Sequence, residues 1–521
     1  MNGIMIQGTS SDSGKSFIVT GLCRLLSDMG INICPFKSQN MSNNAYVTHD
    51  GLEISTAQAL QAQAARLTPE VFMNPILLKP RHNTSSEIIL NGRVFAHSTK
   101  HYREFTQNEG IKAVRESLRH IENNFDAVII EGAGSPAEIN LNANEIVNMR
   151  IAREADVDVI LIADVDRGGS LASVAGTLEL LDSDRERVKG IIYNKFRGNI
   201  ELLKSAIKWT ENYTGIKVIG VIPFLESANL SGEDSLNIRN INRHAEISIG
   251  IINFPGISNF GDFDAFIHEP DVNLIYIDDN MRIKDFHELD AIILPGTKNT
   301  FASLEWLKDS GLDVMIRNFR GLIFGICGGM QIMGRELFDP NHIENENMSH
   351  AYGLNLIPSV TRFNSHEKIT RQVHGFISGT QEDIHGYEIH YGLTHHEYDH
   401  DFHPLFMIKE SPEGIMSHDE RITRRYNDDC RRYITPDESP EGITSHDMRI
   451  AGTYIHGIFG NDNFRSLWLN GIRRKKNYGT RSAHTVKKDS YDEIASVLAH
   501  NLDIDFILKL ILHEDTMLQP E

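Results

Sequence analysis

Short apolar runs alternate with helical patterns along the first half of the chain. Residues 3–7 (GIMIQ) form an apolar run that ends in a Gly/Ser-rich loop, and residues 16–30 then show helical spacing. Each of four further apolar runs leads into a polar loop: residues 33–36, 127–134, 157–164 and 188–194. Because apolar strands separated by helices are typical of parallel sheets covered on both faces, the pattern predicts an α/β domain.

A polar linker near residues 224–245 divides the chain. Beyond it, the alternation of strand and helix begins again with EISIGIINFPG at residues 246–256. The length of 521 residues exceeds what one hydrophobic core usually supports, which favours two large domains or three. We therefore expect one domain over residues 1–235 and a second over residues 246–521.

The composition indicates a folded protein without nucleic-acid or membrane partners. Hydrophobic residues make up 40% and charged residues 23% of the chain, and the net charge of −20 disfavours broad contact with phosphate backbones. The four cysteines form no CxxC pair, as expected in a reducing compartment. No apolar run reaches transmembrane length and the N-terminus lacks a signal-peptide pattern, so we expect a cytoplasmic protein.

The stretch QGTSSDSGKS, residues 7–16, nearly matches a phosphate-binding loop. Its glycines, Gly8 and Gly14, have five residues between them where the standard motif has four. Gly14, Lys15 and Ser16 still open the following helix in the register that this chemistry needs, with Lys15 reaching the terminal phosphates and Ser16 reaching Mg²⁺. A Ser/Gly turn that only caps the helix is the alternative.

Other polar residues follow predicted strands, at the edge of the sheet where ligands bind. Glu131, in VIIEGAGS, is placed to bind the metal that phosphoryl transfer requires, although such a carboxylate often only caps a helix. Lys37 could contact the same phosphates or be a solvated lysine. Asn194 and Lys195 end another strand, where an amide could recognise the nucleotide base.

The second domain contains a cysteine in a glycine-flanked turn. Residues 321–334, GLIFGICGGMQIMG, run from an apolar strand into a helix with Cys327 at the tip of the turn. The G-x-C-x-G arrangement is the cysteine form of a nucleophile elbow, and the N–H of Gly328 can bind a developing oxyanion. A buried, unreactive cysteine is the alternative.

A nucleophilic thiolate needs a base and an oxyanion hole. His456, in AGTYIHGIFG, follows a predicted strand 129 residues after the cysteine and is the candidate base. The stretch ILPGTKNT supplies another turn after a strand, where the N–H of Gly296 or Thr297 could complete the oxyanion hole.

A nucleotide site followed by a cysteine elbow is the plan of a glutamine-dependent amide ligase. From residue 4 to about residue 506, the chain resembles the cobyric acid synthase family, the glutamine-hydrolysing amidotransferases of cobalamin biosynthesis. FKSQNMSNNA and EGAGSPAEINL are the most diagnostic stretches, and DVDRGGSLAS, LPGTKNT, GYEIHYG and GTYIHGIF also match. The resemblance implies two domains, an N-terminal P-loop NTPase-like parallel sheet flanked by helices and a C-terminal class I glutamine amidotransferase-like α/β domain.

The first domain is also similar to dethiobiotin synthetase, whose phosphate loop has the same GT-x4-GK form, so the extra loop residue is compatible with a working ATP site. With the residue pattern, the resemblance implies ATP and Mg²⁺ as cofactors. The expected ATP contacts are Thr9, Ser13, Gly14, Lys15, Ser16, Lys37 and Asn194. The expected metal contacts are Ser16, Glu131 and Glu53. The expected substrate contacts are Asn40, Asn43 and Arg167, for which ordinary loop hydrogen bonding is the alternative.

The family also implies a mechanism and a substrate. Cys327 would attack the carboxamide of glutamine, His456 would protonate the departing ammonia, and water would then release glutamate. Ammonia would react with a substrate carboxylate that ATP has phosphorylated. The substrate of the family is adenosylcobyrinic acid a,c-diamide, which is amidated on its b, d, e and g side chains. A homo-oligomer is compatible with the resemblance.

Some positions depart from related patterns. Class I amidotransferases commonly have a glutamate two residues after the histidine, but this chain has Ile458, as the family resemblance predicts. The sequence therefore does not show what orients His456. Thr56 stands where the family favours a basic residue, and Gly256, in FPGISNFGDFD, is a similar departure from the family's pattern.

The last part of the chain contains an internal repeat. KESPEGIMSHDERI at residues 409–422 recurs as DESPEGITSHDMRI at residues 437–450, with 11 of 14 positions identical. We interpret the segment 409–450 as a tandem duplication that adds a surface hairpin or loop, with a regulatory insert as the alternative. The C-terminal stretch SVLAHNLDIDFILKLILHEDTM has apolar spacing and an acidic balance, and we expect it to pack against the second domain.

Other functions stay open on the sequence alone. Cobyrinic acid a,c-diamide synthase shares both domain types, although FKSQNMSNNA and GYEIHYG favour the cobyric enzyme. A partitioning-type ATPase switch also has a deviant P-loop, but it would have no reason to carry a cysteine elbow. An inert binding module is the remaining alternative for the second domain.

Overall fold

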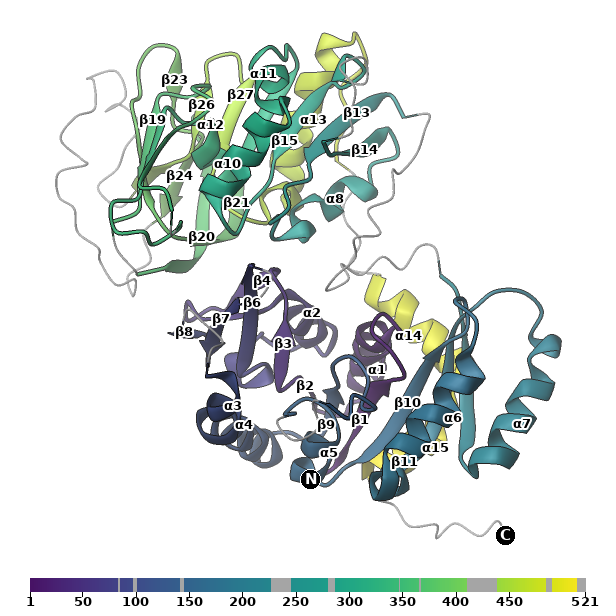
Figure 1. Cartoon of the computed structure of the whole chain (residues 1–521). Helices are drawn as coiled ribbons and strands as arrows, with labels where there is room; N and C mark the ends of the chain where they lie inside the picture. Colours follow the sequence, from purple (N-terminus) through teal and green to yellow (C-terminus); the bar gives the residue numbers. More distant parts are fainter. Residues whose placement is uncertain are drawn as a thin grey trace. The chain divides into compact units, whose positions relative to one another are not determined.

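The computed structural model describes residues 1–82, 85–96, 101–140, 145–225, 245–279, 286–345, 347–364, 367–409, 438–483 and 490–512. They form two compact units (Figure 1). The first unit holds most of the described residues up to 225 and also residues 490–512. The second unit holds residues 49–51 and the described residues between 245 and 483. Most of the second unit is therefore built from sequence that lies between two parts of the first.

The first unit is built on a six-stranded parallel sheet. In spatial order its strands are β12 (Lys217–Pro223), β11 (Val188–Phe196), β10 (Asp158–Asp164), β1 (Gly3–Gly8), β9 (Ala127–Glu131) and β2 (Ile33–Phe36). The predicted apolar strands and their parallel pairing are thus confirmed. Because β1 lies between β9 and β10, the loops after these three strands meet at one edge of the sheet.

Helices cover both faces of this sheet, because successive side chains of a strand point to opposite faces. On one face, Met5 joins a core with α4 (Ile111–Asn124), α5 (Met149–Ala155) and α6 (Ser170–Leu180). On the other face, Ile4 and Ile6 join a core with α1 (Lys15–Asp28), α14 (Ser490–Asn501) and α15 (Ile504–Leu512). The helices α14 and α15 thus complete the helical layer to which α1 belongs.

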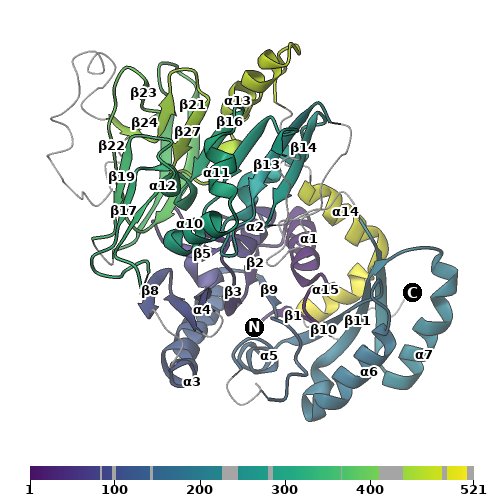
Figure 2. The same cartoon turned by 45° about the horizontal axis from the view of Figure 1, so that its top comes forward.

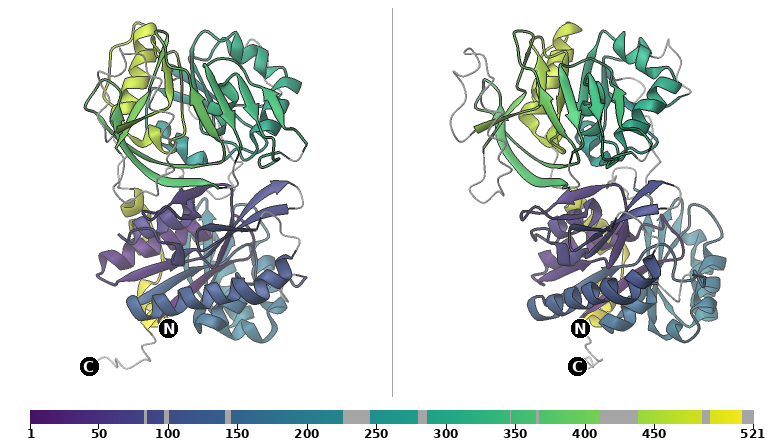
Figure 3. Two further views of the ribbon diagram at one scale, coloured as in Figure 1. Left: turned by 90° about the vertical axis from the view of Figure 1, so that its left-hand side faces the viewer. Right: turned by 60° about the vertical axis from the view of Figure 1, so that its left-hand side comes forward.

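The C-terminal helices pack in the first unit, so the expectation that this segment packs against the second domain is wrong. Ile494 and Leu498 of α14 lie over Gly21 of α1, where a Cβ atom would come within 2.6 Å of both side chains. Ile507 and Ile511 of α15 are fully buried in the same core. Figures 2 and 3 show these helices in yellow among the elements of the first unit. Their apolar stripe covers sheet surface that α1 leaves open, and the second unit ends before α14.

Smaller elements complete the first unit. A four-stranded sheet has the order β3 (Gln39–Met41), β6 (Ile76–His82), β7 (Ser85–Leu90) and β8 (Arg93–Ala96). The hairpin of β4 (Ala45–Val47) and β5 (Glu53–Ser55) leads into α2 (Thr56–Ala64), whose first turn is capped by the Ser55 side chain. The remaining helices are α3 (Tyr102–Phe105) and α7 (Lys204–Thr214). Within the described ranges, no helix is both long and apolar enough to span a membrane.

The second unit is built on a seven-stranded sheet. Its spatial order is β14 (Val272–Ile277), β13 (Ile247–Ile252), β15 (Ala291–Leu294), β16 (Leu322–Ile326), β27 (Ile450–Thr453), β26 (Ile443–Ser445) and β23 (Phe402–His403). The first five strands pair in parallel. β26 pairs antiparallel with β27, and β23 pairs antiparallel with β26. Its helices are α8 (Asp264–Ile267), α10 (Thr300–Asp309), α11 (Leu312–Arg317), α12 (Gly328–Met333) and α13 (Asp462–Lys475). The predicted α/β fold is confirmed here as well.

Two four-stranded sheets flank this core. One has the order β18 (His350–Tyr352), β17 (Glu336–Phe338), β19 (Ser359–Arg362) and β22 (Leu393–His396). The other has the order β21 (Asp383–His390), β20 (Ile369–Ile377), β24 (Phe406–Lys409) and β25 (Glu438–Glu441). The second copy of the repeat therefore supplies β25 and β26, whereas the first copy beyond Lys409 and the residues between the two copies lie outside the described residues. The proposed surface hairpin stays a prediction.

The packing of α14 predicts that truncation of one of its buried apolar side chains lowers the stability of the first unit. Leu498→Ala should destabilise the first unit by about 2–5 kcal/mol, because it removes a fully buried side chain and leaves a cavity over α1. Hydrogen exchange of the β1 and α1 amides should accelerate. Ser496→Ala, on the exposed side of the same helix, is the control. Unchanged exchange in Leu498→Ala would contradict this packing.

Candidate functional site

The predicted phosphate-binding stretch forms a tight loop between β1 and α1. Gly14 has a φ of +96°, and a Cβ atom there would lie 2.0 Å from the side-chain nitrogen of Asn194. A Cβ atom on Gly8 would lie 2.1 Å from Ser13 Oγ. These close approaches require glycine at both ends of the loop. The loop accommodates five intervening residues, and α1 still begins at Lys15.

The polar groups of this loop suit a phosphate ligand. Lys15 Nζ donates hydrogen bonds of 3.1 Å to the carbonyl oxygens of Ser10 and Gly134. Asn194 Nδ2 donates one of 2.9 Å to Ser13 O. The buried Ser13 hydroxyl has no hydrogen-bond partner among the described residues. Because buried polar atoms are normally satisfied, this hydroxyl is suited to a bound phosphate oxygen.

Glu131, at the end of β9, joins two predicted residues and one that was not predicted in one buried cluster. Its Oε1 atom accepts hydrogen bonds from Ser16 Oγ at 2.8 Å and from Lys37 Nζ at 2.9 Å. Its Oε2 atom accepts a hydrogen bond from Gln61 Nε2 of α2. Burial raises the pKa of Glu131, but the Lys37 charge and the hydrogen bonds from Lys37, Gln61 and Ser16 lower it below its ordinary value. An ionised carboxylate beside a serine hydroxyl suits Mg²⁺, which takes few protein ligands and keeps positions for phosphate oxygens and water.

Arg167 and Thr9 also lie at the phosphate loop. The Arg167 guanidinium is 3.3 Å from the Asp12 carboxylate in the middle of the loop. The backbone N–H of Thr9 donates a 2.9 Å hydrogen bond to Ile162 O of β10. Lys195 Nζ, near the end of β11, donates to Asp12 O, so the end of β11 and the loop after β10 hold the phosphate loop. The structure thus places Arg167, a predicted substrate contact, at the rim of the predicted phosphate loop.

The other predicted substrate and metal residues lie around β5 and α2. Asn40 Nδ2 donates hydrogen bonds to Ser55 Oγ at 2.6 Å and to Gln58 Oε1 at 3.0 Å. Asn43 Oδ1 is buried and has no hydrogen-bond partner in the described part of the chain. Glu53 forms a buried ion pair with Lys79. Metal binding by Glu53 would require this pair to open. Within the described ranges, no three His, Cys, Asp or Glu side chains form a metal-binding group.

In the second unit, Cys327 lies between β16 and α12 in a strained turn. Its φ of +51° and ψ of −115° are unusual for a residue with a side chain. A Cβ atom on Gly329 would lie 2.0 Å from Leu294 O, so only glycine fits there. The N–H of Cys327 donates a 2.8 Å hydrogen bond to Thr453 O of the neighbouring strand β27. This bond fixes the elbow against the strand that leads to His456.

His456 follows β27 and is oriented by a buried acid. Its Nδ1 atom donates a 2.8 Å hydrogen bond to Asp262 Oδ2, and the N–H of Gly457 donates one of 2.7 Å to Asp262 Oδ1. The Cys327 sulfur also interacts electrostatically with the imidazole and contributes to its raised pKa. Cys327, His456 and Asp262 are only 7%, 1% and 3% exposed. Position 458, where class I amidotransferases commonly have a glutamate, is Ile in this chain. The acid that orients His456 comes instead from the 3-10 helix η5 (Phe260–Phe263).

This contact controls the charge of His456. Burial lowers the pKa of His456, but the Asp262 carboxylate, its hydrogen bond and the Cys327 sulfur raise it to about 10. The imidazole therefore carries a proton at neutral pH and lies beside a thiol. Such a pair can supply a thiolate nucleophile and a proton donor for a leaving group.

The loop after β15 lies against both groups. A Cβ atom on Gly296 would be 3.0 Å from His456 Cε1, and one on Gly328 would be 3.2 Å from Thr297 N. β15 and β16 are neighbouring parallel strands, so their following loops meet at the same edge of the sheet. The residues predicted for an oxyanion hole are thus brought close to Cys327.

Sequence reasoning missed Gln61 and Asp262. Gln61 is one helical turn from Gln58, and two amides at that spacing on a helix of mostly small residues were an available signal. Asp262 lies 194 residues before His456, in a stretch with another acid at position 264. No spacing rule links such distant residues, so only the fold identifies it.

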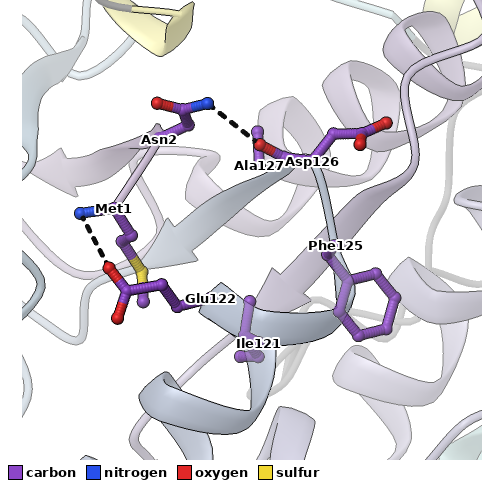
Figure 4. Close-up of a pocket in the computed structure, with 7 residues that line it drawn as sticks. All are labelled: Met1, Asn2, Ile121, Glu122, Phe125, Asp126 and Ala127. Atoms are coloured by element: carbon purple, nitrogen blue, oxygen red, sulfur yellow. Dashed lines mark hydrogen bonds and ion pairs between the residues drawn. The ribbon is translucent and has the colours of Figure 1, made fainter.

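A small pocket lies elsewhere in the first unit (Figure 4). It is lined by Met1, Asn2, Ile121, Glu122, Phe125, Asp126 and Ala127. These residues are at the amino ends of β1 and β9, opposite the edge that carries the phosphate loop and Glu131. The pocket is therefore separate from the candidate nucleotide site.

The pair of His456 and Asp262 predicts the charge behaviour of the elbow. Asp262→Asn keeps an acceptor for the Gly457 N–H but removes the carboxylate, so the pKa of His456 should fall from about 10 towards its ordinary value or below, since burial is no longer opposed. Alkylation of Cys327 by iodoacetamide at pH 7, followed by peptide mass spectrometry, should slow at least about tenfold. Asp264→Asn is the matched control. Alkylation of Asp262→Asn at the parental rate would contradict the assignment.

Family models match both parts of the chain. The model of the CobQ/CobB/MinD/ParA nucleotide binding domain matches residues 4–238. The model of the CobB/CobQ-like glutamine amidotransferase domain matches residues 248–464. The phosphate loop and Glu131 fall in the first match, and Cys327, His456 and Asp262 fall in the second.

Curated relatives are similar over nearly the whole chain. A cobyric acid synthase of Clostridium tetani is 42% identical over 98% of this chain and 98% of its own length. A cobyric acid synthase of Geobacillus sp. is 40% identical over 97% of this chain and 96% of its own length. Among solved structures, PurLQS from Thermotoga maritima is similar to 44% of this chain at 15% identity, over 99% of its own length and with a TM-score of 0.29. The chain belongs to the cobyric acid synthase family, the glutamine-hydrolysing carbon–nitrogen ligases that pair these two domains.

Proposed function

We propose that the chain uses ATP and glutamine to amidate the b, d, e and g carboxylates of adenosylcobyrinic acid a,c-diamide, giving adenosylcobyric acid. The observation that carries the proposal is the presence in one chain of two separate reaction centres. A buried Cys–His–Asp arrangement lies in the second unit, and a phosphate loop with a buried carboxylate lies in the first. Similarity to cobyric acid synthases over 98% of the chain supports the choice of substrate.

In the amidotransferase unit, Cys327 and His456 would release ammonia from glutamine. The Cys327 thiolate attacks the side-chain carbonyl carbon, and the N–H groups of Gly328 and Gly296 stabilise the negative oxygen. The protonated His456 gives its proton to the departing nitrogen, so ammonia leaves and a thioester remains. His456 then takes a proton from water, which attacks the thioester and releases glutamate and the thiolate. Asp262 holds the imidazole in one orientation throughout.

In the synthetase unit, the phosphate loop would bind ATP. Lys15 and the loop N–H groups near Ser13 and Gly14 bind its phosphates, Thr9 and Asn194 support the loop, and Ser16 and Glu131 are the residues suited to Mg²⁺. Bound Mg²⁺ would neutralise charge on the phosphate oxygens. The substrate carboxylate takes the terminal phosphoryl group, which leaves ADP and an acyl phosphate. Ammonia then displaces phosphate from the acyl carbon, and the amide forms with loss of a proton.

The position of Lys37 suggests a role in this unit. Its ammonium group is almost fully buried and bonded to Glu131, so it lies beside the proposed metal position. Metal binding to Glu131 would compete with this ion pair and free Lys37 for a phosphate or for the substrate carboxylate. We also propose Asn40, Asn43 and Arg167 as contacts of the corrinoid side chains and Glu53 as a second acidic contact of the metal. The reaction would take place in the cytoplasm.

Product mass tests the proposal directly. With ATP, Mg²⁺ and glutamine, the protein should convert adenosylcobyrinic acid a,c-diamide into a product that carries four further amides. Cys327→Ala should lose at least about 10³-fold of this activity with glutamine but keep it with ammonium, because only the nitrogen-releasing step needs the thiol. No amidation with either nitrogen source would reject the proposal, and amidation of cobyrinic acid at only two positions would favour the a,c-diamide synthase.

A variant of the phosphate loop should show the complementary behaviour. Lys15→Ala removes the charge expected at the phosphates, so amidation should fall by about 10²-fold or more with glutamine and with ammonium alike. Lys189→Ala, which removes an exposed lysine at the amino end of β11, away from the loop, is the control and should keep the parental activity. Ammonium-dependent activity of Lys15→Ala at the parental rate would contradict the assigned phosphate site.

A further inference from the structure

A buried carboxyl group lies directly behind the cysteine elbow. Glu441, the last residue of β25, is only 6% exposed. Its Oε2 atom accepts a 2.6 Å hydrogen bond from Thr453 Oγ1, and its Oε1 atom accepts a 2.7 Å hydrogen bond from the N–H of Tyr454. Both partners belong to the GTYIHG stretch that ends in the catalytic region. A single carboxyl group therefore joins the second copy of the repeat to this stretch.

The segment that Glu441 holds positions both reacting side chains. Thr453 O accepts the hydrogen bond from the N–H of Cys327, and Thr453 Oγ1 accepts a 3.0 Å hydrogen bond from the N–H of Ile455. His456 follows immediately. Displacement of the Thr453 side chain would thus move the anchor of the elbow and the start of the loop that carries the imidazole.

A group of charged and titratable side chains on β20 and β21 lies near Glu441. Glu388 of β21 is 2% exposed, and the guanidinium of Arg371 from β20 bonds both of its carboxylate oxygens, at 2.9 and 3.1 Å. His390, two residues further along β21, has its Nε2 atom 3.7 Å from the same carboxylate. Between them, the carbonyl oxygen of Ile389 lies 3.8 Å from Cys327 Sγ. The close hydrogen bonds of Arg371 go to Glu388, whereas the hydrogen bonds that Glu441 accepts in the described part of the chain come from neutral groups.

Tyr454 links this group of charges to the thiol. Its ring is stacked on the His390 ring with 3.6 Å between centroids, and its hydroxyl accepts a hydrogen bond from Gln331 Nε2 of α12. Burial, and next the charge of Glu388, raise the pKa of Glu441 to about 8. Two neighbouring buried carboxylates that share one cation ionise one at a time. At neutral pH Glu388 carries the charge and Glu441 carries a proton.

We propose that Glu441 is a positioning residue of the amidotransferase site that works as an uncharged carboxylic acid. The neutral group keeps both contacts, since its O–H can donate to Thr453 Oγ1 and its carbonyl oxygen still accepts from the N–H of Tyr454. Ionisation of Glu441 would add a second buried negative charge beside Glu388, and the repulsion between the two carboxylates would pull Glu441 away from Thr453 and Tyr454 and so displace the anchor of the elbow. The inference rests on the proposed glutamine hydrolysis, and it predicts that the reaction slows when Glu441 loses its proton.

The pH profile of Glu441→Gln tests this assignment. With saturating ATP, Mg²⁺ and corrinoid, kcat/KM for glutamine in the parent protein should fall about tenfold between pH 7 and pH 9, because Glu441 ionises near pH 8 and His456 does not until about pH 10. Glutamine at position 441 is neutral and keeps an acceptor for the N–H of Tyr454. The variant should stay within about threefold of the parent at pH 7 and lose the fall near pH 8. Glu438→Gln, in the same strand and half-buried, should keep the parental profile.

A second measurement needs no activity. The folded protein holds the proton of Glu441 up to about pH 8, whereas the unfolded chain releases it near the ordinary pKa of 4.5. This stabilisation is complete below pH 4.5 and is lost as the pH rises to about 8, so the parent should lose thermal stability over that range relative to Glu441→Gln.

The outcomes separate the two proposals. If the parent does not hydrolyse glutamine, the proposed function fails, and the stability comparison still tests the protonation of Glu441. If the parent is active but Glu441→Gln has the same alkaline fall, or is inactive at pH 7, the inference about Glu441 is overturned and the proposed function stands.

Discussion

Parallel pairing of neighbouring strands is the constraint on which both sites depend. In the first unit, β1 lies between β9 and β10, so the phosphate loop, Glu131 and the loop that carries Arg167 meet at one edge of the sheet. In the second unit, β15, β16 and β27 are adjacent, which brings Gly296, Cys327 and the segment before His456 together. Residues more than a hundred positions apart in sequence thus become neighbours because their strands do.

The sites also show three ways to bury a carboxyl group. An isolated ionised carboxylate in a protein interior costs several kcal/mol, so each needs a compensating partner. Glu131 has an ammonium group and two neutral donors, and Asp262 has an imidazolium and a backbone N–H. Glu441 has only neutral donors, and it retains a proton instead. The chemistry open to each group follows from this difference, since a cation can be displaced by a metal, an imidazolium can give up its proton, and a carboxylic acid that keeps its proton at pH 7 adds no charge to the site.

Local patterns in the sequence predicted much of this structure. The apolar runs that form β1, β9, β10, β16 and β27 are continuous, and the turns after β1 and β16 carry glycines where the backbone requires them. Those signals lie within a few residues of one another, so they do not depend on how the chain folds elsewhere. Asp262 and Glu441 have no such signal, because their partners are set by strand order and not by spacing. The apolar stripe of α14 and α15 indicated that this segment packs against another apolar surface. Such a stripe can pack against many apolar surfaces, so the sequence did not identify the right one, and the expected partner was wrong.

The placement of α14 and α15 has a consequence for synthesis on the ribosome. The face of the first sheet that contains Ile4 and Ile6 is completed only by residues 490–512, whereas the last strand of that sheet ends at Pro223. At about 5–20 residues per second, the intervening sequence takes on the order of 10–50 s to translate. During that time the nascent sheet exposes an apolar surface that its own chain cannot yet cover. The first unit can therefore begin to fold early, but it is completed only after residues 490–512 have been made.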